Sequence, residues 1–237
     1  MAAAGMALMP HARVRGANDD IRVAVIGFRG KGADHIRGFS NMSGVRLVAL
    51  SDADQAILGR EVAKLEKADR KIAAHLDMRR IMDDDDIDAV VTATPNHWHA
   101  LVMIWACQSG KDVYVEKPVS HTVWEGRKMA EAARKYNRIV QSGMQRRSDP
   151  ANREVFAALR EGMLGKMLWA RTVCYTPRES IGKVDGAQPI PETVDYNLWA
   201  GPAPMSPLMR RSFHYDWHWD WQTGNGEIGN NGIHMMD

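Results

Sequence analysis

The sequence contains little cysteine, no long apolar run and no long run of charge of one sign. Its two cysteines, Cys107 and Cys174, lie in apolar surroundings without the spacing of a metal or redox site, so a disulfide framework is not indicated. The 31 basic and 29 acidic residues nearly balance, and no nucleic-acid partner is predicted. The apolar run at residues 2–9 is too short to span a bilayer, so no membrane partner is predicted either.

What remains is an ordinary globular composition. The 237 residues are 45% hydrophobic and 25% charged, enough to bury the core of one large domain or two modest ones. We set residues 1–20 apart from the fold, because a short apolar run is followed there by Pro10 and small residues. This segment is either a tail without structural role or the remnant of an export signal.

Short β-rich apolar runs alternate with helical segments up to residue 142. Strands are expected at residues 21–26, 45–50, 87–94, 112–116 and 138–141. Helices are expected at residues 33–39, 53–68, 78–82, 97–108 and 122–136. Thr122 and Glu125 form a capping box at the start of the last helix. This alternation predicts a doubly wound, mostly parallel α/β sheet over residues 21–142, covered by helices on both faces.

Beyond residue 142 the pattern changes. A helix is expected at residues 152–161 and a long alternating strand at residues 166–175. Six of the ten prolines and half of the eight tryptophans follow. We therefore predict a second domain of α/β or α+β type over residues 143–237, with few strands available for its open sheet.

A glycine cluster follows the first expected strand and opens a helix. Counted from Gly27, the dinucleotide-binding template GxGxxG requires glycine at positions 29 and 32; Gly32 matches, position 29 is Arg29, and Gly30 lies beside it. The match is partial, and glycine clusters also occur at structural turns. Its place between a strand and a helix N-terminus, which can receive a phosphate, favours a dinucleotide site.

Asp52 ends the second expected strand, 25 residues after Gly27. An acid at this place accepts hydrogen bonds from the adenosine ribose hydroxyls. A 2′-phosphate about 4 Å away would be repelled by roughly 4 kcal/mol per charge at an effective dielectric near 20. This predicts NAD rather than NADP by on the order of a thousandfold, unless Arg29 compensates. The alternative is that Asp52 caps the following helix, and both roles can coexist.

The ends of the third and fourth expected strands also carry polar residues, in the runs TPNHWH and EKP. Ligands of open parallel sheets bind beyond the carboxyl ends of the strands. Pro118 disfavours helical geometry at Lys117, which therefore stays extended and points into the crevice. A partly desolvated amine there has a lowered pKa and can exchange a proton with a substrate hydroxyl. A lysine that only covers the strand edge is the alternative.

Two histidines lie in the first of these runs. His97 and His99 are two positions apart at a helix start and make a poor metal pair, and no metal site is predicted. His99 can donate to the cofactor or to a sugar hydroxyl. For His97 a surface position is an equally good interpretation.

Aromatic and basic residues mark the second half. In the stretch YDWHWDW, residues 215–221, we expect about half of the rings to line the site and half, by alternation, to pack, with Trp219 among the candidates for substrate contact. Arg146 and Arg147 either bind a substrate carboxylate or cover the domain junction.

Several spaced motifs together resemble one family. They are VAVIGFRGKG, Asp52, ATPNHWHA, GKDVYVEKP, QSGMQRRS, LWAGPAP and GNGEIGNNGIHMMD. The combination resembles the Gfo/Idh/MocA group of NAD(P)-dependent oxidoreductases, which includes glucose-fructose oxidoreductase and inositol dehydrogenase. The resemblance implies an N-terminal Rossmann domain and a second α/β domain whose open sheet often mediates oligomers, so a homo-oligomer is expected.

The resemblance also assigns roles to residues. It implies that Lys117 of the EKP motif and His234 act on the substrate hydroxyl beside the nicotinamide. Where the family's pattern has an aspartate, this chain has Asn230, which cannot exchange protons and is expected only to position the substrate. The expected NAD-binding residues are Gly27, Phe28, Arg29, Gly30, Gly32, Asp52, Thr94, Pro95, Asn96, His99, Glu116, Lys117 and Gln145. The expected substrate-binding residues are Arg146, Arg147, Trp219, Asn230 and His234.

The leading hypothesis for function is a dehydrogenase that moves a hydride between NAD and a hydroxyl-bearing carbon of a sugar, cyclitol or derivative. The alternatives are an NAD-dependent glycosidase or lyase that oxidises the sugar transiently, and a non-catalytic NAD-binding protein. Family members usually continue well past the histidine that corresponds to His234, so a C-terminally shortened chain is expected. A cytoplasmic location is expected for the chain as it stands, and a periplasmic one if a twin-arginine signal precedes it.

Overall fold

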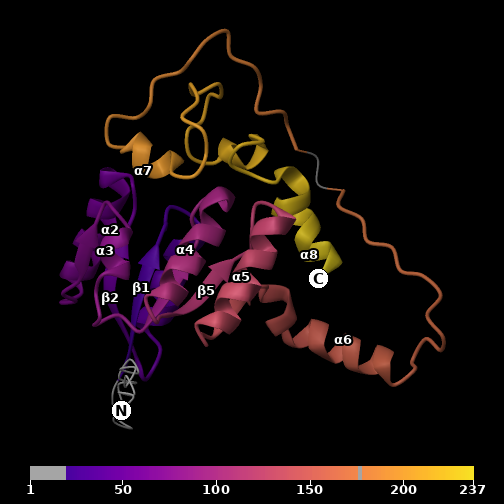
Figure 1. Cartoon of the computed structure of the whole chain (residues 1–237). Helices are drawn as coiled ribbons and strands as arrows, with labels where there is room; N and C mark the ends of the chain where they lie inside the picture. Colours follow the sequence, from indigo (N-terminus) through magenta and orange to yellow (C-terminus); the bar gives the residue numbers. More distant parts are fainter. Residues whose placement is uncertain (1–19, 176–177) are drawn as a thin grey trace, which may run out of the picture.

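The computed structural model describes residues 20–175 and 178–237 (Figure 1). Six strands form one sheet in the order β3-β2-β1-β4-β5-β6, and every neighbouring pair is parallel. The strands are β1 (Ile21–Ile26), β2 (Val45–Ser51), β3 (Ala73–His75), β4 (Ala89–Thr92), β5 (Asp112–Glu116) and β6 (Val140–Gly143). The prediction of a doubly wound parallel sheet is confirmed.

The α-helices that accompany the sheet are α1 (Lys31–Ser40), α2 (Gln55–Lys67), α3 (Arg79–Met82), α4 (Asn96–Gln108) and α5 (Val123–Lys135). Those that follow it are α6 (Pro150–Arg160), α7 (Tyr196–Ala200) and α8 (Ile233–Met236). Short 3-10 turns η1 (Gln145–Ser148) and η2 (Asp216–Trp219) and a π-helical turn η3 (Ile228–Gly232) complete the described elements.

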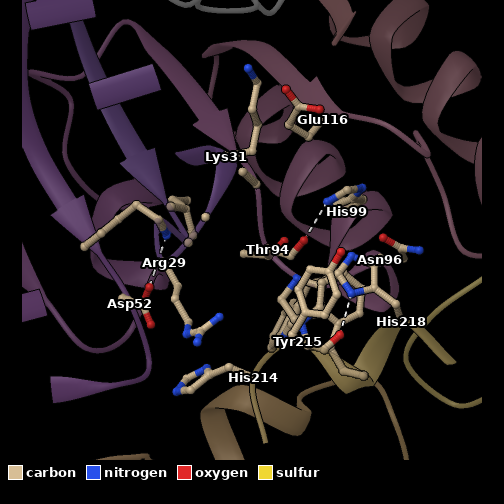
Figure 2. A pocket seen from close by; sticks show the side chains of 18 of the residues that line it. Arg29, Lys31, Asp52, Thr94, Asn96, His99, Glu116, His214, Tyr215 and His218 are labelled. Atoms are coloured by element: carbon tan, nitrogen blue, oxygen red, sulfur yellow. Dashed lines mark hydrogen bonds between the residues drawn. The ribbon is translucent and has the colours of Figure 1, made fainter. Parts of the chain in front are cut away.

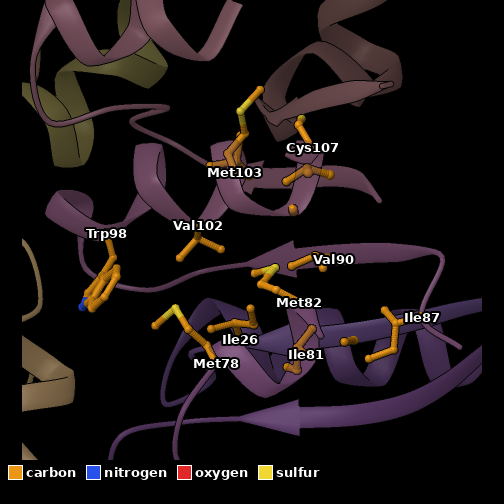
Figure 3. Close-up of a cluster of buried hydrophobic side chains, with 14 of the residues drawn as sticks. Ile26, Met78, Ile81, Met82, Ile87, Val90, Trp98, Val102, Met103 and Cys107 are labelled. Carbon is orange, nitrogen blue, oxygen red and sulfur yellow. The ribbon is translucent and has the colours of Figure 1, made fainter. Parts of the chain in front are cut away.

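The core lies in two layers because alternate residues of each strand face opposite sides of the sheet. In β1, Val23 and Val25 pack with α1 and α2, whereas Ala24 and Ile26 pack with α3 and α4 on the other face. Figure 3 shows this second layer, where methionines of and beside α3 meet the buried side of α4. Burial of a side chain such as Ile26 contributes about 1.5–3 kcal/mol, so both faces hold the strands in place.

The strand order reverses between β1 and β4. Connections from β1 run towards β2 and β3, and those from β4 run the other way, so the carboxyl ends of β1 and β4 flank a switch point. Ligands of doubly wound sheets bind there. The topology thus assigns the binding edge before any side chain is considered.

Local signals set most element boundaries. The Thr122–Glu125 capping box is confirmed, with Glu125 N donating to Thr122 Oγ1 at 3.2 Å and Thr122 N donating to Glu125 Oε2 at 2.7 Å. The edge strand β3 was not predicted, because its three residues AAH carry no apolar alternation. β4 is shorter than predicted, and β6 begins at Val140.

The predicted strand at residues 166–175 is wrong. This segment is irregular and largely exposed, with Leu168 and Trp169 at 80% and 77% exposure. A strand needs a neighbour to pair its backbone N–H and C=O groups, and the described residues contain no strand after β6. Apolar alternation alone therefore did not suffice. The chain leaves α6, runs outward and returns at α7 (Figure 1).

The segment that returns at α7, called the covering segment below, packs on the carboxyl edge of the sheet. Val194, Trp199, Leu208 and Phe213 form a small buried cluster that also contacts Ala53, directly after β2. Asp54 and Val194 form an antiparallel bridge. The second half of the chain thus covers the switch point. Within the described residues, no helix has the length and apolar content needed to cross a bilayer.

Candidate functional site

A cavity of about 360 Å³ lies between the carboxyl ends of the strands and this covering segment. Predicted site residues that line it are Gly27, Phe28, Arg29, Gly30, Asp52, Thr94, Pro95, Asn96, His99, Glu116, Lys117, Gln145, Asn230 and His234. The second half of the chain also contributes Leu198, Trp199, His214, Tyr215, Trp217, His218 and Gly229. Figure 2 shows labelled side chains from both halves facing one another.

The glycine turn is shaped by close backbone approaches. Gly27 has a positive φ of 74°, which favours glycine, and a Cβ there would meet backbone atoms of Thr94 at 2.9 Å. A Cβ at Gly32 would lie 2.1 Å from the carbonyl oxygen of Gly27, so Gly32 allows the helix to pack on the turn without lining the cavity. Helix α1 has no side-chain cap at Gly30. Its first N–H groups are therefore available to a phosphate.

Asp52 ties β2 to the glycine turn. One carboxylate oxygen accepts from Phe28 N at 3.1 Å, and the other accepts from Asp54 N at 3.0 Å. Burial raises the pKa of Asp52 to about 6. The alternative role as a helix cap falls to another residue, because Asp54 caps α2 by accepting from Ala56 N at 2.9 Å.

His99 does not serve as the donor that the sequence suggested. It is 1% exposed; its Nδ1 lies 2.7 Å from Pro118 O and its Nε2 lies 2.8 Å from Thr94 O. Both ring nitrogens thus face backbone carbonyls of the ends of β4 and β5. His99 joins the two strand ends, and neither nitrogen is directed at a ligand.

Glu116 has a partner that sequence reasoning missed. Its Oε1 lies 2.8 Å from His35 Nε2 on α1, and its Oε2 accepts from Lys117 N at 3.1 Å. Burial by itself would raise the pKa of Glu116, but the hydrogen bonds with His35 and the Lys117 backbone outweigh it and lower the pKa. The carboxylate next to Lys117 is therefore charged at neutral pH. No motif marks His35, whose role depends on how α1 lies against β5.

Lys117 reaches across to the C-terminal segment. Its Nζ donates to Asn230 O at 2.7 Å, and burial lowers the pKa of its amine in spite of the nearby Glu116 and Glu227. The Lys117–Pro118 peptide bond is cis.

Two further predicted residues meet Lys117 here. Nδ1 of His234 is buried and has no hydrogen-bond partner within the described residues. Burial, followed by the charges of Lys117 and Arg146, lowers the pKa of His234. Asn230 lies on the turn η3, one helical turn before His234, and its side-chain amide lies 3.5 Å from Glu227 Oε2. An amine, an amide and an unpaired imidazole thus lie at one end of the cavity.

Buried contacts hold this C-terminal segment in place. His97 is 3% exposed, so its interpretation as a surface residue is wrong; its ring lies 3.3 Å from Thr223 O and 3.1 Å from Trp199 O. Burial lowers the pKa of His97 to about 4, which keeps it neutral. His121 adds a contact of 3.2 Å to Gly224 O, and a Cβ at Gly224 would lie 2.3 Å from His218 O.

Asn96 and His214 make further links between the halves. Asn96 Nδ2 donates to Asn225 Oδ1 at 2.8 Å, and Asn225 lies between Gly224 and Gly226. His214 Nε2 lies 2.8 Å from Asp54 Oδ2, so the residue that caps α2 also anchors the covering segment. Sequence reasoning missed these partners because they lie far apart along the chain.

Four predicted site residues do not line the cavity: Gly32, Arg146, Arg147 and Trp219. Arg147 Nε pairs with Asp237 Oδ1 at 2.5 Å, an intramolecular contact at the protein surface. The guanidinium of Arg178 lies 4.6 Å from the Trp219 ring centre, outside the cavity wall. Of the aromatic stretch, Tyr215, Trp217 and His218 line the cavity. The expected alternation is wrong, because residues 216–219 form the turn η2, in which the adjacent Trp217 and His218 both face the cavity.

Comparison with known proteins gives two family matches. Residues 21–144 match the Gfo/Idh/MocA model described as an oxidoreductase family with NAD-binding Rossmann fold, and residues 129–237 match the C-terminal alpha/beta domain of that family. The first match covers the glycine turn, Asp52 and the EKP run. The second covers Asn230 and His234.

Individual relatives match over part of the chain. Inositol 2-dehydrogenase 1 of Saccharopolyspora erythraea is 37% identical over 147 residues, 61% of this chain and 43% of that protein. A glycosyl hydrolase family 109 protein of a Shewanella species is 33% identical over 158 residues, 63% of this chain and 34% of that protein. The chain thus spans well under half the length of these relatives.

Solved structures agree on the fold. Myo-inositol 2-dehydrogenase from Lactobacillus plantarum superposes with a TM-score of 0.56 at 31% identity, covering 62% of this chain and 43% of that one. An NAD binding oxidoreductase from Klebsiella pneumoniae covers 92% of this chain and 51% of that one, with a TM-score of 0.62 at 23% identity. The second likeness shows the fold alone.

The glycine turn gives a direct test of the cofactor site. Replacing Gly32 by alanine puts a Cβ 2.1 Å from Gly27 O, and we expect a loss of about 1–3 kcal/mol in unfolding free energy together with weaker NADH binding. Gly38→Ala, on the same helix with nothing within 4 Å of the added Cβ, is the control and should not lose stability. Denaturant unfolding measures the unfolding free energy of the two variants, and fluorescence titration measures their affinity for NADH. Equal behaviour of the two variants would contradict the assigned packing role.

Proposed function

The chain belongs to the Gfo/Idh/MocA family of oxidoreductases with an NAD-binding Rossmann fold, and we propose that it transfers a hydride between NAD and a hydroxyl-bearing carbon of a sugar, cyclitol or derivative. The observation that carries this proposal is the meeting of Lys117, Asn230 and His234 at the end of β5, in the same cavity as the glycine turn and Asp52. The glycine turn and Asp52 would hold the dinucleotide, and Lys117, Asn230 and His234 would then face its hydride-transferring end.

The chain's own groups fit this cofactor. The uncapped N-terminus of α1 offers N–H donors to the pyrophosphate, and Asp52 offers a carboxylate to the adenosine ribose. The residues at the ends of β4 and β5, from Thr94 and from Glu116, line the cavity further along. When bound, NAD accepts or returns the hydride. Every other step falls to side chains of the protein.

Lys117 and His234 handle the hydroxyl proton. Burial lowers the pKa of both groups, which favours the neutral amine and the neutral imidazole over their charged forms, and either neutral form can accept a proton from a substrate hydroxyl. Asn230 cannot exchange a proton, but its side-chain amide can orient a hydroxyl. Its backbone carbonyl oxygen accepts from the Lys117 amine and orients it. The inositol dehydrogenases among the relatives support a cyclitol or sugar as the substrate class.

Cofactor preference is expected to depend on the charge of Asp52. In Asp52→Asn the amide oxygen still accepts from Phe28 N, but the repulsion of a 2′-phosphate disappears. We expect the preference for NADH over NADPH, on the order of a thousandfold, to fall to within about tenfold. Since the pKa of Asp52 is about 6, the wild-type preference should also narrow as the pH falls from 7.5 to 5, and more than that of the variant. Fluorescence titration with both nucleotides measures this, and a pH dependence equal in the two proteins would refute it.

Turnover is expected to depend on the Lys117 amine. Lys117→Ala removes the proton acceptor while leaving the glycine turn and Asp52 in place, so kcat/KM should fall by about 10²–10⁴ with nearly unchanged NADH affinity. Lys128→Ala, on the exposed face of α5, is the control for loss of a lysine and should keep wild-type turnover. Turnover of Lys117→Ala within a few-fold of wild type would contradict the assignment of Lys117 as the proton acceptor.

A second candidate is an NAD-recycling glycosidase or lyase. It is favoured by the family 109 hydrolases among the relatives, which include an alpha-N-acetylgalactosaminidase of Shewanella oneidensis that is 33% identical over 156 residues. In such a reaction NAD oxidises a sugar hydroxyl to a carbonyl, and a substituent β to that carbonyl is eliminated. In the glycosidase water then adds to the resulting double bond, and NADH reduces the carbonyl again. NAD is then unchanged after each turnover.

Product analysis separates the two candidates. Incubation with NAD and free cyclitols or sugars should accumulate NADH at 340 nm if the chain is a dehydrogenase, which is the result we expect. Release of p-nitrophenol from nitrophenyl glycosides without net NADH would favour the glycosidase instead. Binding of NADH with neither product would show a non-catalytic NAD-binding protein and would contradict the proposed function.

A further inference from the structure

His218 lies in the cavity wall beside the group formed by Lys117, Asn230 and His234, and no motif of the family match singles it out. It belongs to the short turn η2, and its ring stacks on Trp217 with centroids 3.6 Å apart at 18°. Tyr215 packs against the ring at 4.8 Å. The imidazole is therefore held between two aromatic residues and has little freedom to rotate.

The hydrogen bond of His218 determines which nitrogen carries the proton. Nδ1 lies 2.5 Å from the carbonyl oxygen of Tyr215, shown as a dashed line in Figure 2. A carbonyl oxygen only accepts, so Nδ1 must carry the hydrogen, and in the neutral ring Nε2 then carries the lone pair. No described residue donates a hydrogen bond to Nε2. Because Nδ1 points back to its own turn, Nε2 points away from that turn.

The surroundings of His218 keep the ring neutral. Burial lowers the pKa of His218, and the positive charges of Lys117 and Arg178 lower it further against the opposing effect of the Tyr215 carbonyl and Glu227. The side chains of His218 and Lys117 line the same cavity. The result is an unprotonated acceptor beside the donors at this end of the cavity.

The other polar groups at this end are already engaged or have another role. Lys117 donates to Asn230 O, Asn230 contacts Glu227, and His234 is assigned to the proton of the reacting hydroxyl. His218 thus contributes an acceptor that these contacts do not supply. A polyol has hydroxyl donors on the carbons next to the one that reacts, and an acceptor held rigidly at the wall can select for one of them.

We propose that Nε2 of His218 accepts a hydrogen bond from a substrate hydroxyl adjacent to the one that is oxidised, and so makes the site specific for vicinal diols of the cyclitol or sugar class. This inference rests on the proposed function for the identity of the reacting hydroxyl. His218 is a specificity-determining residue in this role. It exchanges no proton and forms no covalent bond.

The substitution His218→Asn separates this role from a structural one. The asparagine amide can still donate to Tyr215 O, as Nδ1–H does, but it places no acceptor where Nε2 lies. His214→Asn is the matched control, since it removes another cavity-lining imidazole whose Nε2 is already bonded to Asp54.

The experiment measures binding and turnover of myo-inositol and its monodeoxy analogues, with the NADH complex for binding and NAD for turnover. We expect wild type to bind myo-inositol about 10–100-fold more tightly than at least one monodeoxy analogue, as an acceptor left unpaired requires. In His218→Asn this affinity ratio should fall to within about threefold, with unchanged NADH affinity. In His214→Asn the affinities for myo-inositol and for the monodeoxy analogue should change by the same factor, so that the ratio stays as in wild type.

The outcomes separate the inference from the proposed function. A ratio that persists in His218→Asn, or a wild type that does not discriminate or does not bind these ligands, overturns the inference. Discrimination that depends on His218 in a protein that binds the polyol but reduces no NAD supports the inference and overturns only the dehydrogenase proposal.

Discussion

The site depends on a buried polar contact between the two halves of the chain. His97, at the start of α4, lies within hydrogen-bond distance of backbone carbonyls at Trp199 and Thr223, more than 100 residues further along. A neutral imidazole donates to only one of these two carbonyls. That hydrogen bond offsets part of the cost of burying the ring and ties the covering segment to α4. The placement of Asn230 and His234 opposite Lys117 follows from this anchoring.

The parallel sheet and the covering segment each supply part of the site. The sheet brings the ends of β1, β2, β4 and β5 to one edge, which supplies the glycine turn, Asp52 and Lys117. The covering segment closes that edge and lowers the polarity around the amine and the imidazoles. Desolvation is the first cause of the lowered pKa of Lys117, His234 and His218, so burial at this edge favours the uncharged, proton-accepting form of each group.

Sequence reasoning succeeded where the determining interactions are local. Apolar alternation placed β1, β2 and β5 closely, and the Thr122 capping box marked the start of α5, because strand burial and capping involve neighbours within a few residues. It failed at residues 166–175, where alternation was present but no partner strand lies alongside. It also failed at His99, whose two nitrogens are occupied by carbonyls that no local pattern could reveal.

The sequence by itself determined the α/β class, the binding edge of the sheet and the identity of Lys117 and Asp52 as residues at strand ends, since periodicity and parallel connection leave few other arrangements. Only the tertiary structure decided that Asp54 caps α2, that His35 pairs with Glu116 and that His218 presents an acceptor to the cavity. The physical reason is that each of these roles depends on the hydrogen-bond partner that a side chain meets after packing. Such partners lie on elements whose mutual orientation is not encoded in any short stretch of residues.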